Sequence, residues 1–335
     1  MSLPAFAAVA QPREAPYVLV LGIGQDGGVP QAGTKDHPGW SDPAARHLVV
    51  SLALVDPATS QRWLFEATPD FREQLHRLDA AFPVEEKPGL AGVFLTHAHM
   101  GHYTGLMFLG HESMGAQGVP VYAMPRMQDY LRTNGPWDQL VRYENIALRP
   151  LADGVPVRLN DRLTVTPFLV PHRQEYSEVA GFRIDGPNRS VLFIPDIDAW
   201  ETWEAQGTRI EALLADVDVA YLDATFYANG ELPGRDMSGF PHPFITHRQC
   251  LSSGDSQPSI QHYPSSHASF RALVLTYGEA RSASASRSAP LGPAMLGCAS
   301  THAAKAAASS CIRRRRASRP FRPLRERQPS CRSRS

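Results

Sequence analysis

Three histidines stand close together at positions 97, 99 and 102, directly after the apolar run 93–95. In an extended chain alternate side chains share a face, so His97 and His99 can point at one ion while His102 returns from the turn that follows. Neutral imidazole nitrogen is a good ligand for zinc and iron. Surface histidines also cluster by chance, but the apolar strand that leads into this cluster favours a metal. The spacing therefore predicts a metal site.

Other polar side chains also follow directly on strand-like runs. These runs and the residues after them are 163–170 with His172, 190–194 with Asp196, and 219–222 with Asp223. A layered α/β domain gathers such residues along one edge of a sheet. We therefore expect them to converge with the histidine cluster on one rim.

Each of these residues also has an interpretation without chemistry. His172 could be a core histidine bonded to a carbonyl, although its place after a strand favours ligation. Asp196 could cap a helix that begins near Trp200. Asp223 could form an Asx turn after its strand, and this alternative stays open. It also stays open whether His242, between two prolines, lines a pocket or sits in a rigid loop.

The glycine-rich segment 21–31 invites a dinucleotide-binding interpretation. Its spacing does not match Gly-x-Gly-x-x-Gly followed by a helix, because Pro30 and Gly33 break any helix there. We expect a tight loop beside the metal rim instead.

The residues 97–102 read His-Ala-His-Met-Gly-His, which resembles the His-x-His-x-Asp-His motif of the metallo-β-lactamase fold superfamily. In that motif the first two histidines serve one metal position, and the aspartate and last histidine serve a neighbouring one. Gly101 stands at the aspartate position and cannot ligate. This departure points to a single metal, or to an ion completed by other groups.

Further segments are similar to the branch of that superfamily that contains coenzyme PQQ synthesis protein B. They follow the order of that branch over about residues 17–245, and they are 21–31, 97–106, 171–177, 193–200, 221–226 and 241–245. The cysteine-rich zinc motif that often follows the first loop in that branch is absent from 32–38. The resemblance implies an α/β (α+β) fold, a four-layer αββα sandwich.

The leading hypothesis is a metal-dependent hydrolase that uses a metal-activated water. The metal ligands that it assigns are His97, His99, His102, His172 and Asp196. Asp196 or Asp223 would orient the water as a base. The expected cofactor is a divalent metal, zinc first, with iron and manganese as alternatives. The expected partner is a small-molecule or peptide substrate of undetermined identity.

Two other functions are weighed against hydrolysis. The resemblance also implies an oxygenase or carrier role like that of PQQ synthesis protein B, with iron for O₂ chemistry on a peptide tyrosine. A third possibility comes from the arginine-rich tail, which could bind nucleic acid or an anionic surface. We rank this last because the tail lacks interleaved aromatic residues.

The charge of the 335-residue chain balances to zero, but residues 251–335 hold thirteen Arg and one Lys against three acidic residues, a net charge of +11. We divide the chain into an N-terminal segment 1–16, a metallo-β-lactamase-like domain 17–250 and a low-complexity basic tail 251–335. We expect the tail to be disordered or frameshifted, with only 270–277 able to form a strand. The sandwich would then lack its usual C-terminal elements and a last histidine ligand, leaving the protein poorly stable or inactive.

The chain has no apolar run long enough to span a bilayer, and its four cysteines lie at 250 and beyond. Residues 3–10 resemble the end of a secretory signal but have no basic start. A cytoplasmic location is the default expectation, and an upstream signal would change it to periplasmic.

Overall fold

The computed structural model describes residues 15–226, 228–232, 234–237, 239–244, 259–261 and 272–276. Contacts divide the chain into the units 1–284 and 285–335, and all the described residues belong to the first unit. The predictions for residues 1–14 and for most of the basic tail therefore lie outside the described residues. Among the described helices, none is long and apolar enough to cross a membrane.

The first sheet has six strands in the order of the sequence. They are β1 (Tyr17–Gly22), β2 (Ser51–Asp56), β3 (Gln61–Phe65), β4 (Gly92–Phe94), β5 (Val119–Ala123) and β6 (Ile146–Pro150). The first three pair antiparallel, and β3 to β6 pair parallel. The accompanying helices are α1 (Phe71–Ala81), α2 (Met100–Tyr103), α3 (Pro125–Thr133) and α4 (Trp137–Arg142), with 3₁₀ turns at Pro38–Trp40, Pro43–Ala45 and Thr104–Leu109.

The second sheet has the order β12-β13-β11-β10-β9-β8-β7. Its strands are β7 (Val157–Arg158), β8 (Thr164–Leu169), β9 (Ala180–Asp185), β10 (Ser190–Ile194), β11 (Val219–Asp223), β12 (Ser259–Gln261) and β13 (Ala272–Thr276). Only β10 and β11 pair parallel, and the helices α5 (Trp200–Ala205) and α6 (Ile210–Ala215) cross between them. Parallel neighbours require such a crossover, and it brings the ends of β10 and β11 to the same edge.

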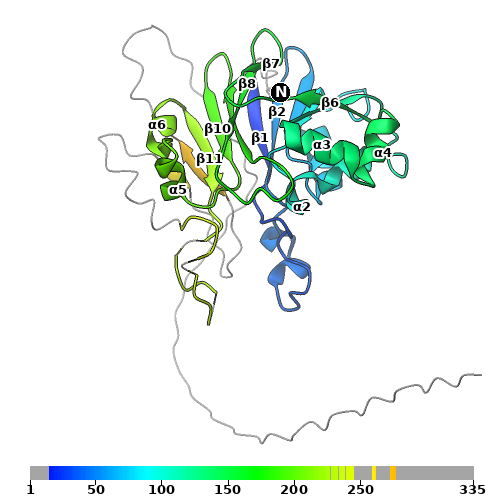
Figure 1. Ribbon diagram of the computed structural model, residues 1–335. Helices are drawn as coiled ribbons and strands as arrows, with labels where there is room; N and C mark the ends of the chain where they lie inside the picture. The colour runs from blue at the N-terminus through cyan, green and yellow to red at the C-terminus, as the bar shows by residue number, and fades with distance from the viewer. Residues whose placement is uncertain are drawn as a thin grey trace, which may run out of the picture. The chain divides into compact units, whose positions relative to one another are not determined.

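Figure 1 shows α3 and α4 on the outer side of the first sheet and α5 and α6 on the outer side of the second. Three clusters of buried apolar side chains hold the two sheets and their helices together. Strand side chains alternate between faces, so in β10 Phe193 enters the core between the sheets while Leu192 and Ile194 pack toward Trp203 of α5. A separate core lies between the first sheet and the helices α1, α3 and α4. The predicted four-layer αββα sandwich is confirmed.

Aromatic rings form the centre of the core between the sheets. Phe65 and Phe94 of the first sheet stack with centroids 5.0 Å apart, and Phe182 of the second sheet meets each of them edge-on at 5.5 Å. Each of these side chains is completely buried. Their contacts pack β9 of the second sheet against β3 and β4 of the first. β3 is followed by Glu66 and β4 by His97, and both residues lie in the candidate site.

The basic tail contributes two of the described strands. β13 pairs with β11 from Ala272 opposite Asp223 to Thr276 opposite Val219, and β12 pairs with β13. The edge of β11 is therefore covered by β13, and the predicted disorder of the rest of the tail stays a prediction. The possible strand at 270–277 corresponds to β13.

We predict that Phe182→Ala lowers the free energy of unfolding by about 3–5 kcal/mol, because it removes a buried ring and leaves a cavity between the sheets. Val155→Ala, at a valine that is 54% exposed, is the control and should cost less than about 0.5 kcal/mol. Urea denaturation of both variants measures the difference. Equal midpoints for the two variants would contradict this account of the core.

Candidate metal centre

The histidine cluster is built at the junction of the two sheets. After β4 the chain stays extended, and the Thr96 carbonyl accepts a hydrogen bond from Ala180 N in β9. The Ala98 amide donates to the Ser177 hydroxyl at 2.9 Å. The short helix α2 then begins, and it turns His102 back toward His97, with ring centroids 4.2 Å apart. The sequence predicted this return by a turn.

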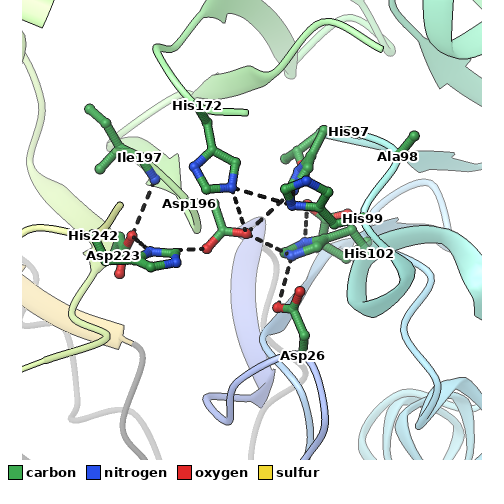
Figure 2. A network of polar contacts seen from close by, with 12 residues as sticks. Asp26, His97, Ala98, His99, His102, His172, Asp196, Ile197, Asp223 and His242 are labelled. Atoms are coloured by element: carbon green, nitrogen blue, oxygen red, sulfur yellow. Dashed lines mark hydrogen bonds and ion pairs between the residues drawn. The ribbon is translucent and has the colours of Figure 1, made fainter. Parts of the chain in front are cut away.

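One group of four side chains converges on a common point. His97, His99, His172 and Asp196 each offer one ligand atom, all within 4.8 Å of one another. Figure 2 shows the Asp196 carboxylate lying among the imidazole rings. The strands bring these residues together as expected from their positions after β4, β8 and β10. Their role as ligands stays a prediction.

The other ring nitrogen of each of these histidines is held by an oxygen. Nδ1 of His97 lies 2.8 Å from the Thr96 hydroxyl, Nε2 of His99 lies 3.1 Å from Glu175, and Nδ1 of His172 lies 2.8 Å from Asp198. The remaining ring nitrogens face one another, and they are Nε2 of His97, Nδ1 of His99 and Nε2 of His172. Metal-binding histidines are oriented in this way by an outer hydrogen bond, which also fixes the tautomer.

The distances between the converging donor atoms suit a metal ion. Two ligand atoms on tetrahedral zinc at about 2.0–2.1 Å are about 3.3–3.4 Å apart. His99 Nδ1 lies 2.8 Å from His97 Nε2 and 3.3 Å from His172 Nε2. Asp196 Oδ2 lies 3.4 Å from His97 Nε2 and 3.9 Å from His172 Nε2. The four donors scatter around the spacing that one ion requires.

A second group surrounds His102. Its Nε2 lies 2.9 Å from Asp196 Oδ2 and 3.1 Å from Asp26 Oδ1, and these three residues also offer ligand atoms within 4.8 Å of one another. Asp26 comes from the glycine-rich loop, which does lie beside the rim. The site is therefore richer in carboxylates than Gly101 suggested.

Glu66 lies on the side of His102 opposite to Asp26 and Asp196, next to the other ring nitrogen. Its carboxylate is completely buried, and Oε1 lies 3.5 Å from Nδ1 of His102. Glu66 follows β3 in the left-handed region, with φ 79°, which costs a residue other than glycine about 1–3 kcal/mol. Such a conformation persists where surrounding contacts impose it, and here Glu66 N donates to the Phe94 carbonyl.

Burial and neighbouring charges set the protonation states. Burial, followed by the nearby histidines, holds the pKa of His97 well below its usual value, so that its imidazole is neutral and able to ligate. Burial also opposes the charged form of His102, but Asp26, Glu66 and Asp196 outweigh it and raise the pKa of His102 well above its usual value. A positive charge is therefore favoured at this second position.

Asp223 is arranged to hold its neighbours. Its Oδ2 accepts hydrogen bonds from Ile197 N at 3.2 Å and from His242 Nδ1 at 2.8 Å. Its Oδ1 accepts from the amide and the hydroxyl of Thr225, which is the Asx-type contact that remained open in the sequence. His242 lies beside the site, with Nδ1 3.9 Å from Asp196 Oδ1. Asp223 positions the Asp196 loop and His242.

The alternative role for Asp196, capping the helix near Trp200, does not apply, since Ala199 is the N-cap of α5 and no side chain caps it. His262, His267 and His302, which the sequence does not favour as ligands, lie outside the described residues. Sequence reasoning missed Asp26, Glu66 and Asp198 as site residues. The only signals for Asp26 were the glycine-rich loop around it and the missing aspartate at position 101.

Comparison with known proteins places the chain in a family. A sequence model described as "Beta-lactamase superfamily domain" matches residues 61–251, which is more than half of the chain. The chain belongs to this superfamily. Coenzyme PQQ synthesis protein B of Xanthomonas axonopodis pv. citri (strain 306) is 27% identical over 238 residues, covering 64% of this chain and 75% of the relative. The chain resembles that protein, as the sequence motifs implied.

Solved structures agree with the fold. Zn(2+)-bound PqqB from Methylobacterium extorquens superposes with a TM-score of 0.58 at 20% identity, covering 70% of this chain and 85% of that one. A diphosphatase from the PhnP family gives a TM-score of 0.50 at 21% identity, covering 71% and 81%. At 20% and 21% identity the likeness to these two structures is one of fold.

We predict that Asp198→Ala weakens zinc binding by about 10–100-fold, because the His172 ring loses the partner that fixes its orientation and tautomer. Asp161→Ala removes a carboxylate that is 94% exposed and serves as the control. Titration of both variants against a chelating zinc indicator gives the affinities. Equal affinity of Asp198→Ala and the unmodified protein would show that the Asp198 contact does not orient a ligand.

Proposed function

We propose that this protein is a metal-dependent hydrolase whose divalent ion is held by His97, His99, His172 and Asp196. The observation that carries the proposal is the convergence of three imidazole nitrogens and one carboxylate oxygen within 4.8 Å, each imidazole being held at its other nitrogen by an oxygen. Zinc is the first expectation, because a tetrahedral set rich in imidazole suits it. The zinc-bound PqqB structure supports the same choice.

The surrounding residues fit hydrolysis. A bound divalent ion supplies Lewis-acid chemistry, which acidifies a water and polarises a carbonyl or phosphoryl oxygen of the substrate. Asp196, only 6% exposed, would orient that water through the carboxylate that it shares between the two groups of candidate ligands. Asp223 Oδ2 lies 2.8 Å from Nδ1 of His242 and so fixes the orientation of this imidazole beside Asp196.

A role in PQQ coenzyme synthesis is the second candidate. It is supported by the 27% identity to the Xanthomonas protein over 238 residues. Such a role would use iron for O₂ chemistry on a peptide tyrosine, or would make the protein a carrier.

The first test of hydrolysis uses His172→Ala. We expect the zinc-loaded protein to hydrolyse at least one of two chromogenic esters, p-nitrophenyl acetate and bis(p-nitrophenyl) phosphate. His172→Ala should reduce kcat/KM by more than about 100-fold, because the ion loses a ligand at the end of β8. His76→Ala, at an exposed histidine of α1, is the control and should retain full activity. Activity that survives His172→Ala unchanged would contradict the proposed centre.

The second test identifies the metal. We expect elemental analysis of protein purified without added metal to find zinc, and an oxygen electrode to record no O₂ consumption with a tyrosine-containing peptide. Iron in the purified protein together with O₂ consumption would overturn hydrolysis in favour of the oxidative role.

A further inference from the structure

We infer that Asp26 supplies the carboxylate that the histidine motif lacks at Gly101, and that with His102 and Asp196 it binds a second divalent cation beside the first. This inference rests on the proposed hydrolase function, because Asp196 is shared with the first group of ligands. It adds a ligand that comes from outside the histidine motif, 76 residues before His102.

The second group has the composition of a metal site. Asp26 Oδ1 and Asp196 Oδ2 lie 3.1 Å and 2.9 Å from the same nitrogen, Nε2 of His102. At the other nitrogen the buried Glu66 lies 3.5 Å away, within the range of an ion pair, and adds a third negative charge beside His102. Figure 2 shows Asp26 below the His102 ring and Asp196 to the left of it, each joined to His102 by a dashed line. Two carboxylates and one imidazole thus converge where a cation would balance their charge.

The space around Gly101 explains why Asp26 occupies this place. A Cβ atom added to Gly101 would lie 2.5 Å from both Cβ and Cγ of Asp26, and 2.7 Å from its Cα. No real Cβ approaches other atoms so closely. A side chain at position 101 and the present loop therefore exclude each other. Glycine at 101 is the condition that lets Asp26 reach His102.

The loop that carries Asp26 is fixed at both ends. Gly24 N donates to the Leu48 carbonyl and its own carbonyl accepts from Val50 N. Val29 exchanges two backbone hydrogen bonds with His47, and Gly28 N closes a turn onto Gln25 across Asp26. Gly28 has φ 76°, which favours glycine. Asp26 therefore lies in a turn whose two ends are fixed by backbone hydrogen bonds, and its side chain reaches His102 from there.

The two groups share Asp196, so the second cation would be adjacent to the first. Oδ2 of Asp196 lies 2.9 Å from Nε2 of His102 and 3.4 Å from Nε2 of His97. Paired ions on a shared carboxylate are a recurring arrangement in enzymes that hydrolyse phosphate esters. The side chain of Asp26 is 44% exposed, so the second position is open to solvent and to a substrate oxygen.

The test counts metal ions in the full chain. Protein loaded with excess Zn²⁺ or Mn²⁺ and dialysed is measured by inductively coupled plasma mass spectrometry. We expect two ions per chain in the unmodified protein, one in Asp26→Asn, and two in Asp36→Asn, which alters an exposed carboxylate of the same N-terminal region. With Mn²⁺, electron paramagnetic resonance should show a coupled pair that becomes an isolated ion in Asp26→Asn.

A second variant removes the whole carboxylate. We expect Asp26→Gly also to hold one ion, because His102 and Asp196 are then left without the third ligand of the second group. One ion in both the unmodified protein and Asp26→Asn would overturn this inference and leave the first site intact. No bound ion in the unmodified protein would instead overturn the proposed function itself.

Discussion

The structure depends on one buried carboxylate. Asp196 is 6% exposed, and its Oδ2 lies within 3.9 Å of Nε2 atoms from His97, His102 and His172. A charged group in such a place is costly unless opposite charge compensates it. Burial keeps His97 neutral, and His102, whose pKa is raised despite its burial, faces Asp26 and Glu66 as well as Asp196. A cation shared with the imidazoles would supply the remaining positive charge. The fold therefore has to place strand ends of both sheets next to Asp196.

The scaffold meets that requirement through ordinary packing. β4 and its extension deliver His97 from the first sheet, while β8 and β10 deliver His172 and Asp196 from the second. Strand β9 pairs with both β8 and β10, and its Phe182 packs against Phe65 and Phe94 of the first sheet, so the aromatic core joins the two sheets beside these strands. The candidate ligands at the sheet edges are therefore held in place by buried apolar residues that do not themselves contact the metal position.

Much of this was visible in the sequence because it is local. The run 190–194 is β10 to the residue, and the spacing of His97, His99 and His102 indicated their convergence. Asp26 and Glu66 were not predictable in the same way. Asp26 meets His102 only through the close approach of two loops, and Glu66 turns toward His102 through a left-handed backbone conformation. For Asp223 the sequence allowed either an Asx turn or a direct role in the site, because its contacts with Ile197 and His242 form only in the folded chain.

The most direct test of the central claim is X-ray diffraction at the zinc absorption edge from crystals grown with zinc. The account predicts an anomalous peak bounded by Nε2 of His97, Nδ1 of His99, Nε2 of His172 and Oδ2 of Asp196. Zinc found only elsewhere on the molecule, with these four side chains hydrogen-bonded to one another and no peak between them, would contradict it.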